Sequence, residues 1–412
     1  MKTDILVLGG GASGLAAAIT AKVTAPEADV RVAEALDRCG KKLLATGNGR
    51  CNIMNALAAP ESYLCDRTFV SPALDLYRQC WPAFWDALGV PLAVEGEGRM
   101  YPLVNQASAV LDALRLRLSD LGIEETTGFR AARIEKRGDG FTVSGPAGEI
   151  SCKKLIVATG GKAGKGLGEN DSFVSLLKPF GHSFTRLYPA LTCLKTEKRL
   201  LNGLKGVRLR GEISLWQGDE RLRSEAGEIL FQDDGLSGIA AMQLSLTAAP
   251  LIGSKELYAR LSPLKNAAEA LKKRVKLYPR RQAQQLLAGT VNRMIALNAL
   301  KRAGIGPTEI AGTLTEKQLE ALAEALDQWC LPVVATGSFA EAQVMLGGAN
   351  TKDFDSYTLE SQKARCLYAA GELLDVTGPC GGYNLEWAWA SGILAGQSAA
   401  KALTGTGKEG WA

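Results

Sequence analysis

The chain has 412 residues, of which 46% are hydrophobic and 22% are charged. This length suggests two or three domains, and the composition excludes a disordered chain, a collagen-like chain and a membrane bundle as the main state. The formal net charge of +5 is small for the length and requires no nucleic-acid partner. No apolar stretch approaches the roughly 20 residues that cross a bilayer, and a predicted strand opens the chain in place of a cleavable signal. We therefore expect a cytoplasmic protein without a membrane partner.

Cysteine and histidine usage argues against two common kinds of site. The nine cysteines are odd in number and scattered, without Cys-x-x-Cys spacing, so we predict neither a disulfide framework nor a zinc ribbon. The single histidine, His182, follows Gly181 in a predicted helix-end turn. One histidine does not suffice for a histidine-based metal site or a Ser-His-Asp triad. We interpret His182 as structural and predict no metal site.

The first 36 residues have the pattern of a β-α-β unit that binds a dinucleotide. An apolar strand leads into the glycine turn 9–14, which opens an Ala-rich helix, and Glu34 follows a second apolar run. Gly9 permits the tight turn, Gly11 lets the backbone approach phosphates, and Gly14 lets the helix lie close to the strand. The free N–H groups of the helix then face a pyrophosphate, and Glu34 is at the right offset to hold the ribose hydroxyls.

Further elements of an α/β domain follow along the chain. Apolar spacing predicts an amphipathic helix over 108–121, ended by Gly122, and a hairpin follows over 130–143. The run 155–158 is almost uniformly apolar, which predicts a strand buried on both faces. Residues 159–161 break this strand with a second glycine turn, at the carboxyl end where open α/β sheets bind ligands.

The middle of the chain differs in character from both ends. Short alternating strands within 191–261 predict a β-rich insert. The periodicity then becomes helical, and Thr315-x-x-Gln318 is a capping box that opens a helix. Strand character returns near 333–335 and at 366–370. We predict a nucleotide-binding domain over 1–190 and 345–412, a β-rich insert over 191–261 and 331–344, and a helical subdomain over 262–330.

Two further segments favour a flavin dinucleotide. The loop 41–55 contains three cations together with glycines and amide side chains, which suit the phosphates and ring of an extended dinucleotide; a basic surface loop is the alternative. Near the other end, Gly381-Gly382 opens an apolar helix after a strand that ends at Gly371-Glu372. The partial positive charge of such a helix start suits the N1/O2 edge of a reduced flavin. We interpret Trp387 and Trp389 as core residues, because these positions cannot both face one ligand.

Together these motifs resemble those of the HI0933-like and BaiN-like bacterial flavoproteins, a family of NAD(P)/FAD-dependent oxidoreductases. The residues that carry the resemblance are Gly9–Gly14, Glu34, 47–52, 158–161, 227–231 with 235–238, and 378–384 with 387–389. The resemblance implies an α/β fold in which an FAD-binding Rossmann-type domain, similar to that of glutathione reductase, is split by a β-barrel-like insert and a small helical cap. It also implies an FAD-dependent oxidoreductase.

The expected reaction moves a hydride between a small-molecule substrate and flavin N5, with NAD(P)H or O2 as co-substrate. We expect the substrate between the FAD domain and the insert. No second Gly-x-Gly-x-x-Gly motif follows a strand, so NAD(P)H is expected to dock transiently without a domain of its own. With so little histidine, the catalytic acid or base is a Tyr, Lys, Asp, Glu or water, and the sequence does not choose among them.

The resemblance also assigns roles to residues of the cofactor site. The pyrophosphate is expected on Gly11, Ser13 and Gly14, the ribose on Glu34 and the adenine near Ala131. The phosphate and flavin side is expected on Lys41, Lys42, Gly47, Asn52, Glu372, Asn384 and Leu385. The complete predicted site consists of Gly9, Gly11, Ala12, Ser13, Gly14, Glu34, Ala35, Lys41, Lys42, Gly47, Arg50, Cys51, Asn52, Ala131, Thr159, Gly160, Gly161, Gly371, Glu372, Gly381, Gly382, Tyr383, Asn384 and Leu385. Segments 160–165 and 168–171 depart from the family pattern and are expected to border the substrate or a nicotinamide entry route.

The most basic stretch, 272–281, permits other interpretations. This stretch can contact RNA or a membrane surface, but a solvated helix face is favoured, because Tyr278 is the one aromatic residue among these cations. An FAD-dependent protein that modifies or binds RNA and a flavin sensor without turnover are the alternatives. We interpret Cys51 and Cys380 as packing residues, with a redox-active pair as the alternative. No sequence feature specifies an oligomeric state.

Overall fold

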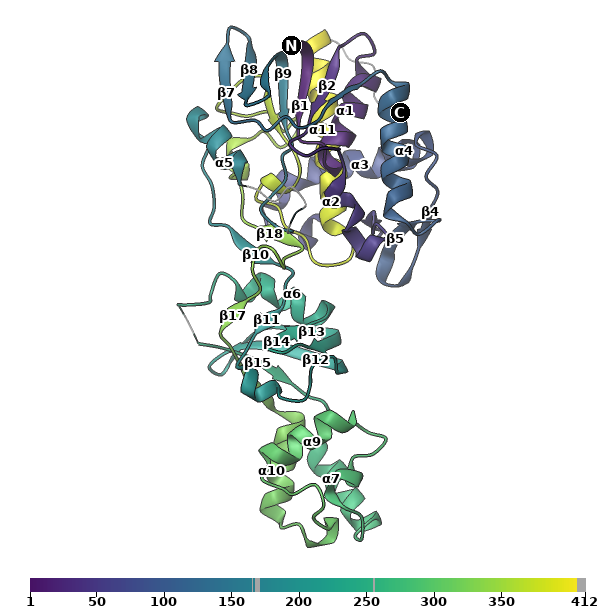
Figure 1. Cartoon of the computed structure of the whole chain (residues 1–412), viewed down its shortest axis with the longest axis vertical. Coiled ribbons are helices and arrows are strands. Elements are labelled where there is room, and N and C mark those ends of the chain that lie inside the picture. The colour runs from purple at the N-terminus through teal and green to yellow at the C-terminus, as the bar shows by residue number, and fades with distance from the viewer. Residues whose placement is uncertain (165, 167–170, 255, 406–412) are drawn as a thin grey trace. The chain divides into compact units, whose positions relative to one another are not determined.

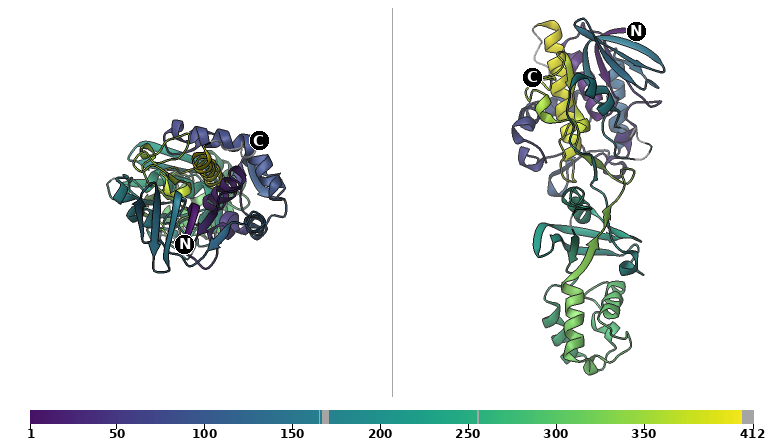
Figure 2. Two further views of the ribbon diagram at one scale, coloured as in Figure 1. Left: turned by 90° about the horizontal axis from the view of Figure 1, so that it is seen from above. Right: turned by 90° about the vertical axis from the view of Figure 1, so that its left-hand side faces the viewer.

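The computed structural model describes residues 1–164, 166, 171–254 and 256–405 and divides into two compact units (Figure 1, Figure 2). The first unit comprises Met1–Tyr188 and Val344–Ala412, and the insert unit comprises Pro189–Gln343. Lys165 and residues 168–170, which belong to the segment expected to border the substrate, lie outside the described residues. Among the helices of the described part, none combines the length and apolar character that a membrane span requires.

A seven-stranded sheet forms the centre of the first unit. Its order is β6-β2-β1-β9-β8-β7, and β19 also pairs with β9. Strand β1 pairs in parallel with β2 and with β9, and β19 pairs in parallel with β9. Strand β8 pairs antiparallel with both β7 and β9. The bounds are β1 (Lys2–Leu8), β2 (Val30–Ala33), β6 (Glu124–Thr126), β7 (Arg133–Arg137), β8 (Gly140–Gly145), β9 (Gly148–Val157) and β19 (Leu367–Ala369). The end of β9 is fully buried at Leu155, Ile156 and Val157, because β1 and β19 flank it.

Two helices from opposite ends of the sequence lie side by side in this unit (Figure 1). They are α1 (Ala12–Thr24) and α11 (Tyr383–Thr404). A Cβ atom at Gly392 would collide with the carbonyl oxygen of Ser13, and one at Gly396 with that of Ala17. Two glycines one turn apart therefore let α11 approach the backbone of α1. The other α-helices and strands of the unit are α2 (Lys41–Leu44), α3 (Arg67–Ala87), α4 (Ala107–Asp120), α5 (Ser172–Leu177), β3 (Met54–Asn55), β4 (Leu92–Val94), β5 (Arg99–Pro102) and β18 (Val344–Leu346). Strand β10 (Tyr188–Ala190) begins in this unit and ends in the insert unit.

The long helix α3 is an element that the sequence analysis does not predict. Pro72 and Pro82 lie inside it, and proline normally ends or kinks a helix. The helix begins because the carboxylate of Asp66 accepts a hydrogen bond from the N–H of Thr68 at 2.9 Å. It persists because one apolar face is buried, with Trp85 1% exposed. Tertiary burial therefore outweighs the local cost of the prolines.

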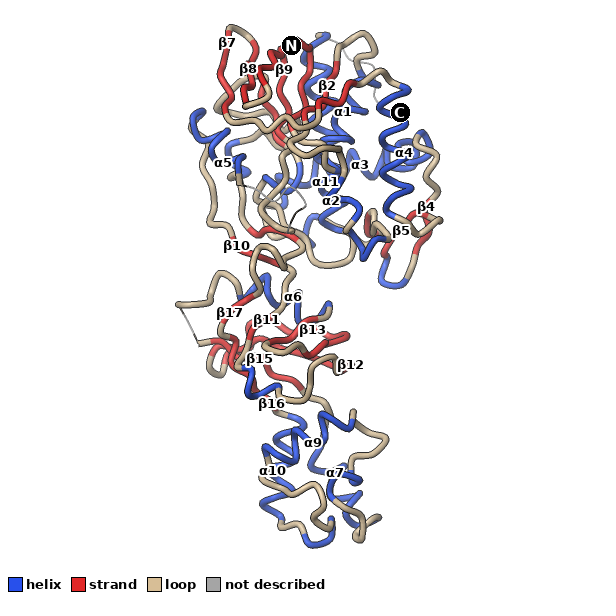
Figure 3. The backbone as a smooth tube through the Cα atoms, in the orientation of Figure 1, coloured by secondary structure: helices blue, strands red, loops and turns tan. Residues whose placement is uncertain are grey.

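The insert unit contains a barrel-like antiparallel sheet, which Figure 3 separates by colour from the helices. Its order is β16-β15-β12-β13-β14-β11-β17. Val334 alone separates β16 from β17, and its N–H donates to the carbonyl oxygen of Lys195 at 3.0 Å. The two ends of the path are therefore one continuous segment, which closes the sheet. The bounds are β11 (Leu194–Lys195), β12 (Arg208–Gln217), β13 (Glu220–Phe231), β14 (Gly235–Ser237), β15 (Leu257–Leu261), β16 (Trp329–Val333) and β17 (Ala335–Thr336), with α6 (Ile239–Ala248) packed on β13.

The α-helices of the insert unit other than α6 form a separate core. They are α7 (Ala267–Leu277), α8 (Ala283–Leu286), α9 (Arg293–Arg302) and α10 (Glu316–Asp327), and they bury Leu271, Leu286, Leu300 and Leu322. The predicted capping box is present, because the N–H of Gln318 donates to Thr315 Oγ1 and Gln318 Oε1 accepts from the N–H of Thr315. We call residues 262–330 the helical module. The boundaries that the sequence analysis gives for the three domains remain predictions.

Candidate dinucleotide site

The glycine turn after β1 has the steric features that the motif requires. Gly9 has a φ of +109°, and a Cβ atom there would collide with the carbonyl oxygen of Ala158. A Cβ atom at Gly14 would collide with the carbonyl oxygen of Gly9. At Gly11, the N-cap of α1, a Cβ atom would meet no described atom within 4 Å. The start of α1 therefore packs tightly at Gly9 and Gly14. It is open at Gly11, where its free N–H groups can bind an anion.

Glu34 lies beside this turn and is held in one orientation. Its Oε2 accepts a hydrogen bond from the N–H of Gly10 at 2.7 Å, and its Oε1 accepts one from the N–H of Leu36 at 2.8 Å. The N–H of Phe129 donates to the carbonyl oxygen of Glu34 at 2.8 Å, which brings the loop that contains Ala131 towards the carboxylate. Each carboxylate oxygen can accept a further hydrogen bond. The acid can therefore hold ribose hydroxyls without losing its backbone partners.

Three segments distant in sequence meet next to the helix start. A Cβ atom at Gly371, which has a φ of +82°, would collide with Ser13 Oγ. Lys42 Nζ donates to Glu372 Oε2 at 2.6 Å, and the N–H of Met345 donates to Glu372 Oε1 at 2.8 Å. The Cβ position of Gly161 lies 2.9 Å from Glu372 Cδ. The turn after β19, the turn after β9 and the loop after β2 thus line one continuous region.

The start of α11 is tied to the loop that contains Asn52. Gly382 has a φ of +104°, and its Cβ position lies 2.6 Å from the carbonyl oxygen of Met54 and 2.9 Å from Asn52 Oδ1. Asn55 Nδ2 donates to the carbonyl oxygen of Gly381 at 2.8 Å. These contacts join residues more than 300 positions apart, so the two predicted flavin segments form one structure.

Whether a dinucleotide fits this region can be tested on its buried polar atoms, two of which have no hydrogen-bond partner among the described residues. These two atoms are Asn52 Oδ1 and Thr159 Oγ1. Buried polar groups are normally satisfied, so an orphaned atom at a ligand site indicates a missing partner. At Gly160, as at Gly11, a Cβ atom would meet no described atom within 4 Å. The residues present therefore fit an extended ligand that supplies hydrogen-bond donors and phosphate charge.

Glu386 and Asn55 are site residues that the sequence analysis did not select. The N–H of Asn55 donates to Glu386 Oε2 at 2.9 Å, and Glu386 is only 2% exposed. Burial raises the pKa of Glu386 to about 7, against the opposing effects of the Asn55 N–H and the Arg78 charge. The available signal was a lone acid in the otherwise apolar start of a helix. Its burial depends on packing between distant segments.

Several predicted residues have protein partners of their own. Arg50 donates to Asn105 Oδ1 at 2.6 Å, pairs with Glu95, and lies with its guanidinium 4.0 Å from the Tyr101 ring centroid. Lys41 pairs with Asp37. Their assignment to the cofactor remains a prediction.

Cys51 is buried, and burial raises the pKa of its thiol to about 12. This thiol stays protonated at neutral pH, which supports the interpretation as a packing residue.

The remaining predicted residues lie on the same turns and helix starts. Asn384 holds the loop before α11, because its side chain bonds both the N–H and the carbonyl oxygen of Gly378 at 2.9 Å. The carbonyl oxygen of Tyr383 accepts from Tyr63 Oη at 3.0 Å. Ala12 and Leu385 lie in the first turns of α1 and α11, and Ala35 follows Glu34. The Cβ position of Gly47 lies 2.8 Å from the backbone nitrogen of Asn52.

His182 lies away from these turns and is buried. Its Nδ1 is 3.0 Å from the carbonyl oxygen of Leu177, its Nε2 is 2.8 Å from Ser361 Oγ, and its ring stacks on Phe354 with centroids 4.9 Å apart. Burial lowers the pKa of this imidazole. These contacts describe a neutral structural histidine. Trp387 and Trp389 are likewise core residues, 1% and 0% exposed.

Comparison with known proteins places the chain in a family. The model of the HI0933-like protein Rossmann domain matches residues 3–398. A 3-dehydro-bile acid delta(4,6)-reductase from Clostridium scindens is 35% identical over 96% of this chain and 98% of that relative. A ribosomal RNA dihydrouridine synthase from Haemophilus influenzae is 27% identical over 94% of this chain and 96% of that relative.

A solved structure shares the fold at low sequence identity. It is a 3-ketosteroid delta1-dehydrogenase from Sterolibacterium denitrificans, 12% identical, with a TM-score of 0.51 over 97% of this chain and 100% of that chain. With the split Rossmann domain and the barrel-like insert described above, the expected fold class is confirmed. The chain belongs to the HI0933-like family and is an FAD-dependent oxidoreductase with a Rossmann-type FAD-binding domain.

Proposed function

We propose that the protein reduces a carbon–carbon double bond conjugated with a carbonyl group, with FAD as the resident cofactor and NAD(P)H as the electron donor. The observation that carries this proposal is the continuous cradle in which Gly11, Glu34, Glu372 and Gly382 lie together with the unpartnered Asn52 Oδ1. This cradle fits a dinucleotide that is bound in an extended form. The cytoplasmic location expected from the sequence is part of the proposal.

The names of the two relatives share one kind of chemistry. A delta(4,6)-reductase of a 3-dehydro-bile acid removes unsaturation near an oxo group, and dihydrouridine is uridine with a saturated carbon–carbon bond beside a ring carbonyl. In both substrates the carbonyl accepts electron density as a hydride arrives at the β-carbon, and a proton then reaches the α-carbon. The net change is two electrons and two protons. A small conjugated ketone is the substrate class that we favour, because the bile acid reductase is the more similar of the two relatives.

The chain contributes binding and electrostatics, and bound FAD would supply the hydride. The open start of α1 at Gly11 would bind the pyrophosphate, and Glu34 would hold the ribose. The start of α11 at Gly382 would place partial positive charge near the flavin ring. Asn52 Oδ1 is free to accept a hydrogen bond there. NAD(P)H would transfer its own hydride and leave as NAD(P)⁺, which balances the electrons.

Anaerobic spectroscopy tests this proposal. The FAD-loaded protein is mixed with NADH or NADPH without oxygen, and the flavin absorbance is followed. We expect bleaching by one or both nicotinamides and recovery of the oxidised spectrum when a conjugated cyclic enone is added. A saturated ketone of the same ring size is the matched control and should not restore the spectrum. Recovery with oxygen but not with the enone would contradict the reductase and favour an oxidase. A protein that neither nicotinamide bleaches would favour a flavin sensor.

A second candidate is the same reduction on a uracil ring within RNA. The observation that favours it is the similarity over almost the whole chain to a relative named as a ribosomal RNA dihydrouridine synthase. The reduced protein is incubated with an unmodified ribosomal RNA transcript, and the RNA fragments are weighed by mass spectrometry. A gain of two hydrogens on one uridine would establish this activity. An unchanged transcript, together with turnover of the cyclic enone, would reject it.

A further inference from the structure

The helical module contains a long stretch from which acidic residues are absent. Residues 270–308 include nine Lys or Arg residues and no Asp or Glu. The acids nearest in sequence are Glu269 before this stretch and Glu309 after it, and four more lie on α10. The module therefore has cations on α7, α9 and the segment between them, and acids mainly on α10. The acids of α10 reach α7 at Lys272, which lies 3.7 Å from Glu316, so positive charge dominates only beyond it, at the end of α7 and in the turn after it.

Some of these cations stabilise the module itself. Arg274 Nε donates to the carbonyl oxygen of Leu286 at 2.5 Å, and its Nη2 donates to that of Ala288 at 2.7 Å. Arg302 is packed with its guanidinium 4.6 Å from the Trp329 ring centroid, and burial lowers its pKa to about 10. Lys272 lies 3.7 Å from a carboxylate oxygen of α10. Arg274 and Arg302 are therefore structural, and Lys272 already has an acidic neighbour.

Other cations face solvent at the end of α7 and in the turn that follows. Lys273, Lys276 and Arg280 are exposed and form no ion pair with any described residue. Arg281 lies with its guanidinium 3.7 Å from the ring centroid of Tyr278, which is 36% exposed. Exposed cations around an exposed aromatic ring are typical of surfaces that bind single-stranded nucleic acids, because phosphates pair with the cations and bases stack on the ring.

The turn that presents Tyr278 is fixed in place. The N–H of Ala311 donates to the carbonyl oxygen of Arg281 at 2.8 Å, and the N–H of Gly312 donates to that of Pro279 at 2.9 Å. A second segment of the module thus holds both ends of the turn. A ring that is already ordered loses little conformational entropy when a base stacks on it.

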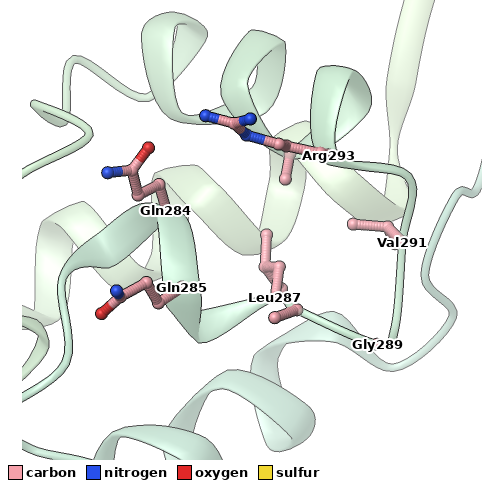
Figure 4. A pocket seen from close by; sticks show the side chains of 8 residues that line it. Gln284, Gln285, Leu287, Gly289, Val291 and Arg293 are labelled. Atoms are coloured by element: carbon pink, nitrogen blue, oxygen red, sulfur yellow. The ribbon is translucent and has the colours of Figure 1, made fainter.

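A pocket opens beside the basic segment (Figure 4). It has a volume of about 480 Å³. Arg274 of α7 donates hydrogen bonds to the carbonyl oxygens of Leu286 and of Ala288, which lines the pocket, so the pocket lies next to the basic helix. Gln284 and Gln285 come from α8, and Arg293 comes from the start of α9. The lining also includes the apolar side chains of Leu287 and Val291. A lining with both amide and apolar side chains suits the hydrogen-bonding edge and the flat face of a nucleobase.

We propose that the helical module is a docking site for single-stranded RNA. Lys273, Lys276 and Arg280 bind successive phosphates, Tyr278 stacks on one base, and the pocket beside Arg293 receives another. A membrane surface fits less well, because an interfacial helix needs a broad exposed apolar face. In α7, Ala267 and Leu271 are buried in the core of the module, and Leu277 is the one exposed large apolar side chain of this helix. This binding is separate from the proposed reduction, so each can be tested without the other.

Fluorescence anisotropy of a labelled RNA tests the proposal on the full chain loaded with FAD. The probe is an oligouridine of about 12 nucleotides, titrated at several salt concentrations around about 0.1 M. We expect saturable binding that weakens steeply with salt. The variant Lys273→Ala/Lys276→Ala/Arg280→Ala should bind at least about tenfold more weakly, and its salt dependence should be shallower by about two units on the log–log plot. Tyr278→Ala should weaken binding about fivefold or more with an unchanged salt dependence.

A matched control removes the same charge elsewhere in the insert unit. Lys198→Ala/Arg210→Ala/Arg221→Ala takes three exposed cations from the barrel and its flanking turn, and it should change the affinity by less than about twofold. Equal losses in the two triple variants would overturn the proposal, because binding would then reflect overall charge. Failure of the wild-type protein to bind the oligouridine would overturn it as well, as would binding to anionic phosphatidylserine vesicles but not to RNA.

Two further measurements separate docking from catalysis and from folding. The rate of flavin reduction by NAD(P)H should be unchanged in the triple variant, so loss of RNA binding and failure of the proposed reduction are distinguishable. If the triple variant has a lower unfolding midpoint, Lys276→Glu alone replaces it. This exposed residue forms no ion pair with a described residue, and its reversal should weaken RNA binding about fivefold or more without changing the midpoint. Unweakened binding in this variant would contradict the assignment.

Discussion

The first unit and the helical module differ in whether their charged side chains have partners within the protein. In the first unit the charged groups near the glycine turns are held by the protein, as Glu34 is by two backbone N–H groups and Lys42 is by Glu372. In the helical module, Lys276 and Arg280 are exposed and form no ion pair within the described part of the chain. The contrast fits a ligand of fixed geometry in the first unit and, in the helical module, the RNA partner proposed above.

The largest effect on the first unit is expected from a change at Gly14. A Cβ atom there would collide with the backbone oxygen of Gly9, and neither atom belongs to a flexible side chain. We expect Gly14→Ala to lower the free energy of unfolding by about 3 kcal/mol, as overpacking of a rigid site does. Urea unfolding measures this effect. Gly11→Ala is the control, because its Cβ atom meets open space, and it should cost less than about 0.5 kcal/mol. Equal stabilities of the two variants would contradict the packing argument.

A pH-dependent effect is expected at Glu386. Burial raises its pKa from 4.5 to about 7, so the folded protein holds this proton more tightly than the unfolded chain does. The resulting contribution to stability is complete below about pH 4.5 and is lost as the pH rises to about 7, by at most about 1.4 kcal/mol per pH unit. Glu386→Gln retains an acceptor for the Asn55 N–H but does not titrate.

The stability of Glu386→Gln relative to wild type should therefore rise between about pH 5 and about pH 7 and stay constant at higher pH. Urea unfolding at several pH values measures this difference. Glu61→Gln, at an exposed position, is the control and should show no such trend. A difference between Glu386→Gln and wild type that does not depend on pH would show that Glu386 titrates normally.

A smaller effect separates two neighbouring lysines. Lys42 pairs with Glu372, which lines the cradle, whereas Lys41 pairs with the exposed Asp37. We expect Lys42→Ala to weaken FAD binding about tenfold, which corresponds to about 1.4 kcal/mol, and Lys41→Ala to weaken it less than about threefold. Titration of the apoprotein with FAD, followed by flavin fluorescence, measures both. Similar losses in the two variants would assign Lys41 to the site as well.

Local signals predicted elements of both units, whereas contacts between segments distant in sequence could not be predicted from either segment alone. The turn 9–14 and the capping box at Thr315 can each be identified from a few neighbouring residues, because the glycines of the turn and the side chains of the capping box act locally. The contact between Asn55 and Glu386 joins residues 331 positions apart, and neither segment contains a local pattern that predicts it. Helix α3 was missed because Pro72 and Pro82 oppose it locally, while burial against the core supports it. Local rules therefore identify a ligand-binding turn more readily than the core that supports it.

The flavin content of Gly11→Val tests most directly the claim that the cradle in the first unit binds FAD. Apoprotein is reconstituted with FAD and gel-filtered, and the flavin-to-protein ratio is compared with the urea midpoint. The wild-type protein should retain about one FAD per chain, whereas the valine side chain should fill the space that the pyrophosphate needs and leave almost no flavin bound. The midpoints of the two apoproteins should agree, because a Cβ atom at this position meets no described atom within 4 Å. Equal flavin content in the two proteins, or none in wild type, would contradict the assignment of this site.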